Sequence, residues 1–293
     1  MTSMGRMKAR PLRSALFTPG TEAARLRKAV ESGADVCIFD LEDSVPPGRI
    51  DEARGTVAAA LEELQGRAAI WVRVHPASSP AMVEDVAALP LARADGIMIP
   101  KAGGAAEVAA VRNAVRASQG APELPLIPII ESAAGVLHAF EIATSPDVLC
   151  LAFGRFDLGA DLGVDPDVDG SAVLAARAAL VLSSTAAGLQ RALDSPWVKI
   201  KDLDGLRQAA GRARSEGFGG MLLIHPSHVP IVNEAFSPTA DEIAWARDIM
   251  ASADRATGEG RGAYAREGAM VDEAIVRRAR AILEEHSGAG PAG

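Results

Sequence analysis

Residues 127–131, with the sequence IPIIE, and residues 152–157, with the sequence AFGRFD, indicate how this chain folds. Each is a β-type, largely apolar run that ends in a carboxylate, and one helix-length segment, 132–145, separates them. Two consecutive parallel strands joined by a crossover helix bring their carboxyl ends to the same edge of a sheet. Glu131 and Asp157 are therefore expected to project into one shared space.

Two carboxylates at one sheet edge form a candidate site for a divalent metal ion. Mg²⁺ keeps an octahedral shell of oxygen ligands and rarely binds in an all-protein cage, so two acids with room for water and substrate oxygens suit it. The alternative is two unrelated loop acids, since strands often end in Asp or Glu. The spacing alone leaves both interpretations open.

The composition limits the class of protein and its partners. The chain has 293 residues, 48% of them hydrophobic, and a net charge of −8, which argues against nucleic acid and anionic membrane surfaces as partners. The two cysteines, Cys37 and Cys150, lie in predicted strands and are typical of small buried hydrophobic residues in a reducing compartment. No apolar segment resembles a signal peptide or a membrane span. We therefore expect a soluble, cytoplasmic protein with no membrane partner.

Short apolar runs separated by helical periods predict an α/β fold. The runs cover residues 14–17, 36–39, 70–74, 96–99, 126–130, 148–153 and 221–224, with a weaker one at 197–200. Their apolar residues are continuous, as expected of parallel strands that are covered on both faces. Eight such alternations of strand and helix favour a (β/α)₈ TIM barrel.

The chain continues past the eighth predicted strand, so we expect two domains, a catalytic barrel over residues 1–236 and a helical extension over residues 237–293. Thr239 and Glu242 match a capping box that begins a helix, and a second amphipathic helix carries Ile275, Ala279 and Ile282. Apolar faces outside the barrel have to be buried somewhere. We expect the extension to pack on a neighbouring subunit.

Polar residues follow most of these strands, at the edge where α/β barrels carry their active sites. In chain order they are Thr18, Pro19 and Gly20 (with Arg13 at the start of the same strand), Asp40, Glu42, Asp43, Arg73, His75, Lys101, Glu131, Asp157 and His225. Acids and cations that converge on one rim predict an anionic substrate held at a metal ion. Arg73 lies inside an apolar strand, where an unpaired guanidinium would be costly, so a specific partner is expected.

Several of these residues also have plain structural interpretations. Lys101 is equally typical of a solvated loop charge, and a histidine such as His225 before a proline is more often a capping or packing residue. The acids between 40 and 43 fit a helix N-terminus, where each contributes about a few tenths of a kcal/mol. These alternatives stay open.

Taken in order, a set of short motifs resembles the citrate lyase β-subunit-like enzymes of the HpcH/HpaI aldolase superfamily. The motifs are RSALFTPG at 13–20, FDLEDSV at 39–45, VRV at 72–74, PK at 100–101, IE at 130–131, FGRFDL at 153–158, IHP at 224–226, NEAFSP at 233–238 and MVD at 270–272. No single motif is specific, but the ordered set is, and it covers residues 13 to 283.

The resemblance implies a Mg²⁺-dependent TIM-barrel lyase. Such an enzyme cleaves or forms a 3-hydroxyacyl-CoA thioester of the malyl, citramalyl or citryl type, with an acyl-CoA and a 2-oxo acid as the other reactants. Coenzyme A is then part of the substrate. Relatives of this kind are typically homotrimers or hexamers, so the same assembly is expected here.

The resemblance also assigns roles to residues. Glu131 and Asp157 take the metal-ligand positions, and Asp43 or Asp272 protonates the enolate, a choice that the sequence does not make. Asp272 corresponds to a tail residue that reaches into a neighbouring subunit's site. Arg73 pairs with the oxo-acid carboxylate, and the implied substrate contacts are Arg73, the backbone amides of Gly154, Arg155 and Phe156, the mouth residues Arg13, Pro19 and Gly20, and Glu42 and Lys101.

Departures from the family pattern leave other activities open. His75, His228, Ala269, Ala274 and the bulky pair 155–156 replace residues common in relatives, which affects the acyl and thioester specificity and not the metal site. The alternatives are a (3S)-malyl-CoA-type thioesterase, a malate-synthase-like activity, an aldolase of free 2-oxo acids and an acyl-carrier-protein-dependent citrate lyase subunit. An inactive scaffold is disfavoured because Glu131, Asp157 and Arg73 are all present.

Overall fold

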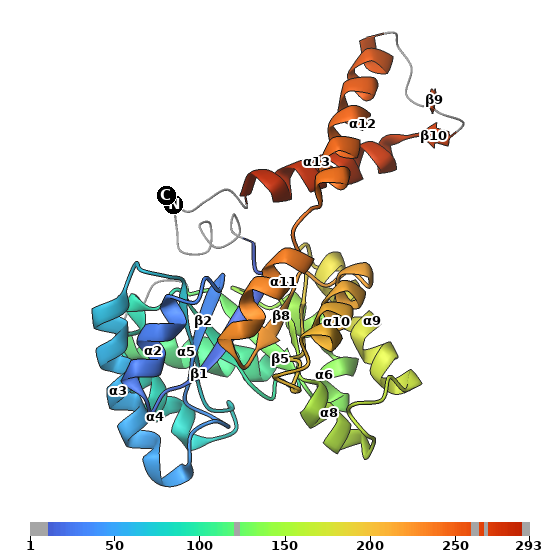
Figure 1. Ribbon diagram of the computed structural model, residues 1–293. Helices are drawn as coiled ribbons and strands as arrows, with labels where there is room; N and C mark the ends of the chain where they lie inside the picture. The colour runs from blue at the N-terminus through green and yellow to red at the C-terminus, as the bar shows by residue number, and fades with distance from the viewer. Residues whose placement is uncertain (1–10, 120–123, 259–263, 267–268, 289–293) are drawn as a thin grey trace. The chain divides into compact units, whose positions relative to one another are not determined.

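The first unit of the chain is a closed barrel of eight parallel strands in sequence order, which confirms the predicted TIM barrel. This computed structural model describes residues 11–119, 124–258, 264–266 and 269–288. The strands are β1 Ser14–Pro19, β2 Val36–Asp40, β3 Ile70–Arg73, β4 Gly96–Ile99, β5 Leu126–Ile130, β6 Ala152–Phe153, β7 Leu193–Asp194 and β8 Gly220–Leu223. β8 pairs with β1 and closes the barrel. Figure 1 shows the helices packed around the strands.

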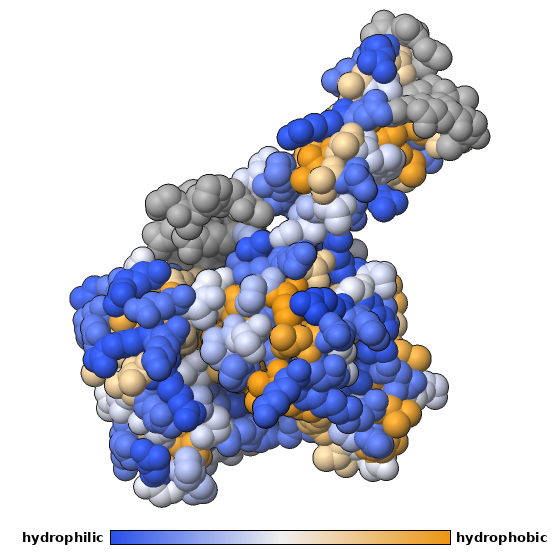
Figure 2. All heavy atoms as spheres, viewed as in Figure 1, coloured by the Kyte–Doolittle hydropathy of each residue, from blue (hydrophilic) through white to orange (hydrophobic). Residues whose placement is uncertain are grey.

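Helices surround the strands and bury one face each. They are α2 Ala23–Val30, α3 Ile50–Leu64, α4 Pro80–Ala88, α5 Ala105–Gln119, α6 Ala133–Leu137, α7 Ala139–Ala143, α8 Arg155–Leu162, α9 Ser171–Ala186, α10 Leu203–Ser215 and α11 Val229–Ala235, with 3₁₀ turns at Pro47–Arg49, Leu91–Arg93 and Pro226–His228. In α3, Val57, Leu61 and Leu64 recur at helical spacing and are buried. Polar residues cover the outer faces of α2 and α3 in Figure 2.

Two apolar layers hold the barrel together. One lies between strands and helices and includes Leu26, Phe39 and Phe153. The other fills the barrel interior around Trp71, which has no exposed surface. A Cβ on Gly96 would lie 2.6 Å from the Trp71 ring, so the glycine in β4 leaves the space that the indole occupies. The interior is therefore a packed core, and any ligand has to bind beyond the strand ends.

Three predicted elements differ from the structure. The weak strand predicted at 197–200 is wrong, because β7 is Leu193–Asp194 and residues 197–200 lie in the loop that follows. β6 contains only Ala152–Phe153 of the predicted 148–153, with Val148 in an isolated bridge. The predicted crossover helix is divided at His138 into α6 and α7. A two-residue strand is too short to show any periodicity in the sequence.

The second compact unit comprises Ser237–Gly293. Its elements are α12 Ala240–Gly258, β9 Tyr264–Arg266, β10 Ala269–Val271 and α13 Glu273–Gly288. The capping box is present, since the Thr239 backbone N–H donates to Glu242 Oε2 at 2.8 Å and the Glu242 N–H donates to Thr239 Oγ1 at 3.2 Å. The helices bury a small apolar cluster that includes Ala246, Ile249 and Ala279. Packing of this unit on a neighbouring subunit stays a prediction.

Across the described parts of the chain, no helix combines the length and the apolar character that a membrane crossing requires.

Candidate functional site

Seven ionisable side chains form a cluster at the carboxyl ends of β2 to β6. They are Asp40, Glu42, Asp43, Arg73, Lys101, Glu131 and Asp157, and we call them the mouth cluster. Six of them lie at the end of a strand or in the loop directly after it, and Asp157 lies in the first turn of α8, which begins two residues after β6. Because all eight strands are parallel, these positions lie at one end of the barrel.

The innermost pair of the mouth cluster is Arg73 with Asp40. The two residues are register partners on β3 and β2, and Arg73 Nε and Nη2 donate to the two oxygens of Asp40 at 2.6 and 2.7 Å. Burial opposes ionisation of Asp40, but the guanidinium contacts outweigh it and the pKa of Asp40 is lowered. The guanidinium also lies 4.6 Å from the centre of the Phe17 ring. Arg73 is thus charged and held in one orientation.

The remaining edge of Arg73 faces the other acids. Its Nη1 lies 3.0 Å from Glu42 Oε2 and 3.5 Å from Asp43 Oδ2. Since Asp40 already takes two of the guanidinium nitrogens, a substrate carboxylate would have to bind at the Nη1 edge. For the carboxylate role predicted from the sequence, Arg73 therefore has only its Nη1 edge, which Glu42 and Asp43 also contact, and not the whole bidentate fork.

Lys101 links Glu42 to Glu131 through two different groups. Its Nζ donates to Glu42 Oε1 at 2.6 Å, and its backbone N–H donates to Glu131 Oε1 at 2.7 Å. Lys101 has a φ of 54°, which is in the left-handed region that residues other than glycine rarely adopt. The backbone strain at this position is compensated by an N–H group that points at a buried carboxylate.

Glu131 is a buried carboxylate among other carboxylates. Burial raises its pKa to about 8, and the charges of Asp157 and Glu42 act in the same direction, while the Lys101 N–H and Arg73 oppose the shift. A Cβ on Gly154 would lie 2.4 Å from Glu131 Cβ, so only glycine at the β6–α8 junction lets β6 approach this side chain. Asp157 is exposed in the first turn of α8.

These two acids fit a hard divalent cation. Excess negative charge around a buried carboxylate is an environment that a bound cation would stabilise. Among the described residues, no three His, Cys, Asp or Glu side chains are grouped as a ready-made metal site. An ion at Glu131 and Asp157 would therefore complete its shell with water and substrate oxygens, which is the usual way that proteins bind Mg²⁺.

Two of the backbone amides predicted to bind a substrate carboxylate have partners inside the protein. The Gly154 N–H donates to the Ile130 carbonyl at 3.0 Å, and the Arg155 N–H donates to Ser195 Oγ at 2.9 Å. The side chain of Arg155 pairs with Asp169. The prediction is wrong for Gly154 and Arg155. Phe156 stays a candidate, because first-turn N–H groups have no acceptor within their own helix.

Of the residues predicted to line the mouth, Pro19 and Gly20 lie there and Arg13 does not. Pro19 ends β1 and Gly20 follows it at the carboxyl end of the strand, and Gly20 donates its N–H to the Asp40 carbonyl at 2.9 Å. Arg13 lies at the opposite end of the same strand, where its Nη2 pairs with Asp35 at 2.8 Å. A six-residue strand separates it from the mouth cluster. The placement of Arg13 at the mouth is therefore wrong.

Asp272 belongs to the second unit and is exposed, and its Oδ1 accepts the Ile275 N–H at 3.1 Å at the start of α13. Its expected role in a neighbouring subunit's site stays a prediction.

Four residues around this site have a role that the sequence did not predict. Phe17 and Asp40 hold Arg73. Asp194 ends β7 and Ser195 follows it, at a strand whose position was predicted wrongly. The pairing of Asp40 with Arg73 could have been predicted by aligning the ends of the second and third strands. His75 and His225 do not join the cluster, since His75 pairs with Asp85 at 2.7 Å and His225 contacts Ser227.

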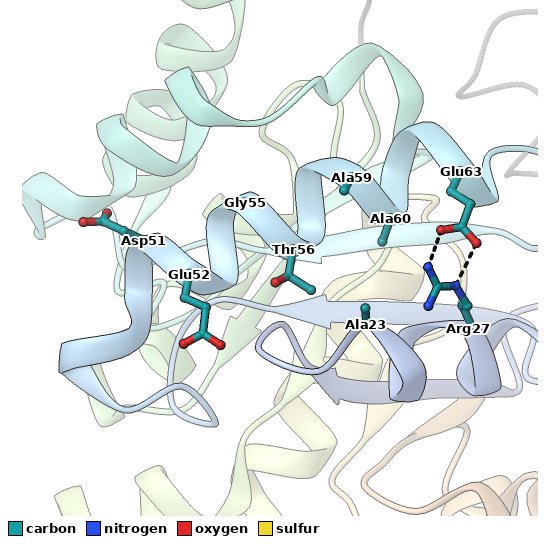
Figure 3. Close-up of a pocket in the computed structure, with 9 residues that line it drawn as sticks. All are labelled: Ala23, Arg27, Asp51, Glu52, Gly55, Thr56, Ala59, Ala60 and Glu63. Carbon is teal, nitrogen blue, oxygen red and sulfur yellow. Dashed lines mark hydrogen bonds and ion pairs between the residues drawn. The ribbon is translucent and has the colours of Figure 1, made fainter.

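Two of the cavities formed by the described residues lie outside the mouth cluster. The larger, about 410 Å³, lies between α2 and α3 on the outer wall of the barrel, and the Arg27–Glu63 ion pair spans it at one end (Figure 3). A smaller one of about 70 Å³ lies beside Ser195 and Trp197. The larger cavity contains none of the residues that the strand ends bring together, so it is not part of the candidate site.

Comparison with known proteins gives consistent matches. The model of the HpcH/HpaI aldolase/citrate lyase family matches residues 13–226. Two proteins of Cereibacter sphaeroides, a (3S)-malyl-CoA thioesterase and an L-malyl-CoA/beta-methylmalyl-CoA lyase, are each 35% identical over 94% of this chain and 95% of their own length. The crystal structure of CitE from Mycobacterium tuberculosis with magnesium, acetoacetate and coenzyme A has a TM-score of 0.79 and 29% identity, covering 95% of this chain and 99% of that one.

Proposed function

The chain belongs to the HpcH/HpaI aldolase/citrate lyase family, and we propose that it is a Mg²⁺-dependent carbon–carbon lyase acting on a CoA thioester. Its substrate is a 3-hydroxyacyl-CoA of the malyl, citramalyl or citryl type, which it cleaves to, or forms from, an acyl-CoA and a 2-oxo acid. The observation that carries this proposal is the pair Glu131 and Asp157 beside the charged edge of Arg73.

Glu131 and Asp157 hold the metal ion in this proposal. When bound, Mg²⁺ polarises the substrate oxygens and stabilises the negative charge that develops on them. The structure of the M. tuberculosis CitE with magnesium and coenzyme A supports this choice of ion and of thioester carrier.

The other residues of the mouth cluster bind and orient the substrate. Arg73 Nη1 donates to the carboxylate of the 2-oxo acid portion, and the Asp40 pair keeps the guanidinium from rotating away. In cleavage the hydroxyl proton goes to a base, and the electrons of the broken C–C bond go to the carbon next to the thioester. That carbon then takes a proton from an acid. The acid is Asp43 or Asp272 in this proposal, and Asp43 is supported by its exposed position 3.5 Å from Arg73.

A thioesterase outcome is the second candidate, because one relative at 35% identity carries that activity in its name. There, water attacks the thioester carbonyl, the C–S bond breaks, and free acid and thiol leave. A malate-synthase-like activity would combine formation of the C–C bond with hydrolysis of the thioester. An aldolase of free 2-oxo acids would need no thioester, and a citrate lyase subunit would take its thioester from an acyl-carrier protein.

One assay separates the lyase from the thioesterase and synthase activities and tests the dependence on the metal ion. Acetyl-CoA or propionyl-CoA is mixed with glyoxylate, pyruvate or oxaloacetate, with Mg²⁺ or with EDTA, and products are identified by mass. The lyase proposal expects a 3-hydroxyacyl-CoA from at least one pair, and none in EDTA. Free thiol together with a free hydroxy acid would indicate the thioesterase or synthase. A C–C bond formed equally well in EDTA would contradict the metal-dependent mechanism.

The assembly is a homotrimer or hexamer in this proposal, with Asp272 acting in a neighbouring subunit's site. Its test mixes two inactive variants, Asp272→Ala and Glu131→Gln, in one oligomer. A shared site predicts that mixed oligomers regain part of the activity, because some sites then combine an intact tail with an intact barrel. Mixed oligomers that form but stay inactive would place Asp272 outside the site.

A further inference from the structure

A closed ring of polar contacts lies against the outside of the barrel beside β7. It runs through Asp194, Arg177, Glu216, Arg212, Asp169, Arg155 and Ser195, and returns to Asp194. We call it the ionic ring. Arg177 Nη1 lies 2.5 Å from Asp194 and its Nη2 lies 2.5 Å from Glu216, while Arg212 and Arg155 both pair with Asp169.

The ionic ring ties together segments that are distant in the sequence. Asp194 and Ser195 come from the end of β7, Arg177 from α9 and Arg212 from α10, while Asp169 lies in the loop between α8 and α9. The small cavity of about 70 Å³ is lined by most of these side chains. With Arg177 only 3% exposed, the inner half of the ring is shielded from solvent.

The ring reaches the candidate metal site through Arg155 and Ser195. Ser195 Oγ donates to the Phe153 carbonyl at 2.7 Å and accepts the Arg155 N–H at 2.9 Å, so it holds the residues on both sides of Gly154. Asp169 holds the side chain of Arg155 as well. Arg155 is the first residue of α8, and Asp157 lies in the same turn.

We propose that Ser195 and Asp169 are positioning residues that hold the first turn of α8, and with it Asp157, at the place where the metal ion binds. Arg155 transmits this constraint and does not contact the substrate. The inference rests on the proposed metal-dependent function, because its consequence is a change in Mg²⁺ affinity. Groups that orient metal ligands typically change affinity about 10- to 100-fold when they are removed.

The test is isothermal titration of the full chain with MgCl₂, comparing wild type with Ser195→Ala. The alanine leaves the Arg155 N–H and the Phe153 carbonyl without the hydroxyl, so the first turn of α8 relaxes and Mg²⁺ binding weakens about 10-fold. Ser195→Thr keeps a hydroxyl and is expected to recover most of the affinity. Ser184→Ala is the matched control, because Ser184 is 1% exposed and its hydroxyl has no hydrogen-bond partner in the described structure.

A second variant acts on the other contact of Arg155. Asp169→Asn removes the charge that Arg155 and Arg212 share, and it is expected to weaken Mg²⁺ binding about 3-fold at low salt and less at 0.5 M salt, since the pair is partly exposed. Glu52→Gln is its control, since the Arg49–Glu52 pair on the outer wall is unconnected to α8.

Each outcome has one meaning. Wild type that does not bind Mg²⁺ overturns the proposed function itself. Wild type that binds Mg²⁺, with both Ser195→Ala and Asp169→Asn binding equally well, overturns the positioning role alone. If Ser195→Ala does not fold by circular dichroism, Asp169→Asn decides the question, because its side chain is in a loop and 26% exposed.

Discussion

The mouth cluster and the ionic ring are both built from ionisable side chains near strand ends, but they differ in charge balance. The mouth cluster has five carboxylates and two cationic side chains. The ionic ring has three carboxylates and three guanidinium groups. A balanced set needs nothing further, whereas the unbalanced set gains stability from a bound cation. We therefore interpret the mouth cluster as residues that bind a ligand and the ionic ring as residues that hold neighbouring segments of the chain in place.

The two regions also differ in what each arginine contacts. Arg177 of the ring is held by Asp194 and Glu216 and lies 4.7 Å from the Phe218 ring. Arg73 of the mouth cluster is held by Asp40 and Phe17 in a similar way, but its Nη1 edge faces a cluster with excess negative charge. Similar local packing thus serves structure in one place and substrate binding in the other.

The largest expected effect is the difference in turnover between two variants that each lose one carboxylate, one in the mouth cluster and one in the ionic ring. Glu131→Gln should lower turnover by about 10³-fold or more, because a metal ligand is lost and the developing charge is no longer stabilised. Glu216→Gln in the ring should leave turnover at saturating Mg²⁺ within about 10-fold of wild type. Both rates are measured with the substrate pair found in the product screen. Equal losses in the two variants would remove the distinction between binding and supporting acids.

The next effect compares the two arginines by the same substitution. Arg73→Lys should lower kcat/KM about 10²-fold, since an ammonium cannot contact both oxygens of Asp40 and a substrate carboxylate at once. Arg177→Lys should instead lower the stability to unfolding by about 1–3 kcal/mol and leave kcat/KM at saturating Mg²⁺ nearly unchanged. Steady-state kinetics and urea unfolding separate the two. A near-normal Arg73→Lys enzyme would remove Arg73 from carboxylate binding.

The residues of the mouth cluster could be predicted from the sequence where the strand before them is long enough to show an apolar pattern. β5 has five buried residues, so the apolar pattern places Glu131 directly after it. β7 has only two residues, so it has no apolar pattern that the sequence could reveal. For this reason the positions of Asp194 and Ser195, and the ionic ring that contains them, were not predicted. The use of the Arg155 N–H by Ser195, 40 residues away, depends on a tertiary contact that no local spacing encodes. The prediction for Arg13 failed because the motif at 13–20 spans the whole of β1. The two ends of a strand lie at opposite ends of the barrel, so Arg13 and Gly20 cannot both lie at the mouth.

Glycine substitutions give a smaller and more local comparison. Gly154→Ala should weaken Mg²⁺ binding about 10-fold, because the new Cβ would lie 2.4 Å from Glu131 Cβ and push this carboxylate out of place. Gly211→Ala in α10 meets nothing within 4 Å and should leave Mg²⁺ binding unchanged while stabilising the helix slightly. Titration calorimetry measures both. Unchanged binding in Gly154→Ala would mean that the glycine does not set the position of Glu131.

The smallest expected effect is the pH dependence of stability, and it has opposite signs for Glu131 of the mouth cluster and Asp169 of the ionic ring. Burial raises the pKa of Glu131 to about 8, so between its ordinary value near 4.5 and about 8 the folded chain binds more protons than the unfolded chain. Stability of the metal-free protein therefore falls as pH rises through this window. In the ring, burial opposes ionisation of Asp169 but the pairs with Arg155 and Arg212 outweigh it and lower its pKa, so its contribution is lost only as pH falls through the acid range. Thermal melts from pH 5.5 to 8.5 should show a decline of a few degrees that is absent in Glu131→Gln and is reduced by Mg²⁺, because the bound ion favours the ionised carboxylate. A decline that persists in Glu131→Gln would assign it to another group and leave the charge imbalance at the mouth cluster without this support.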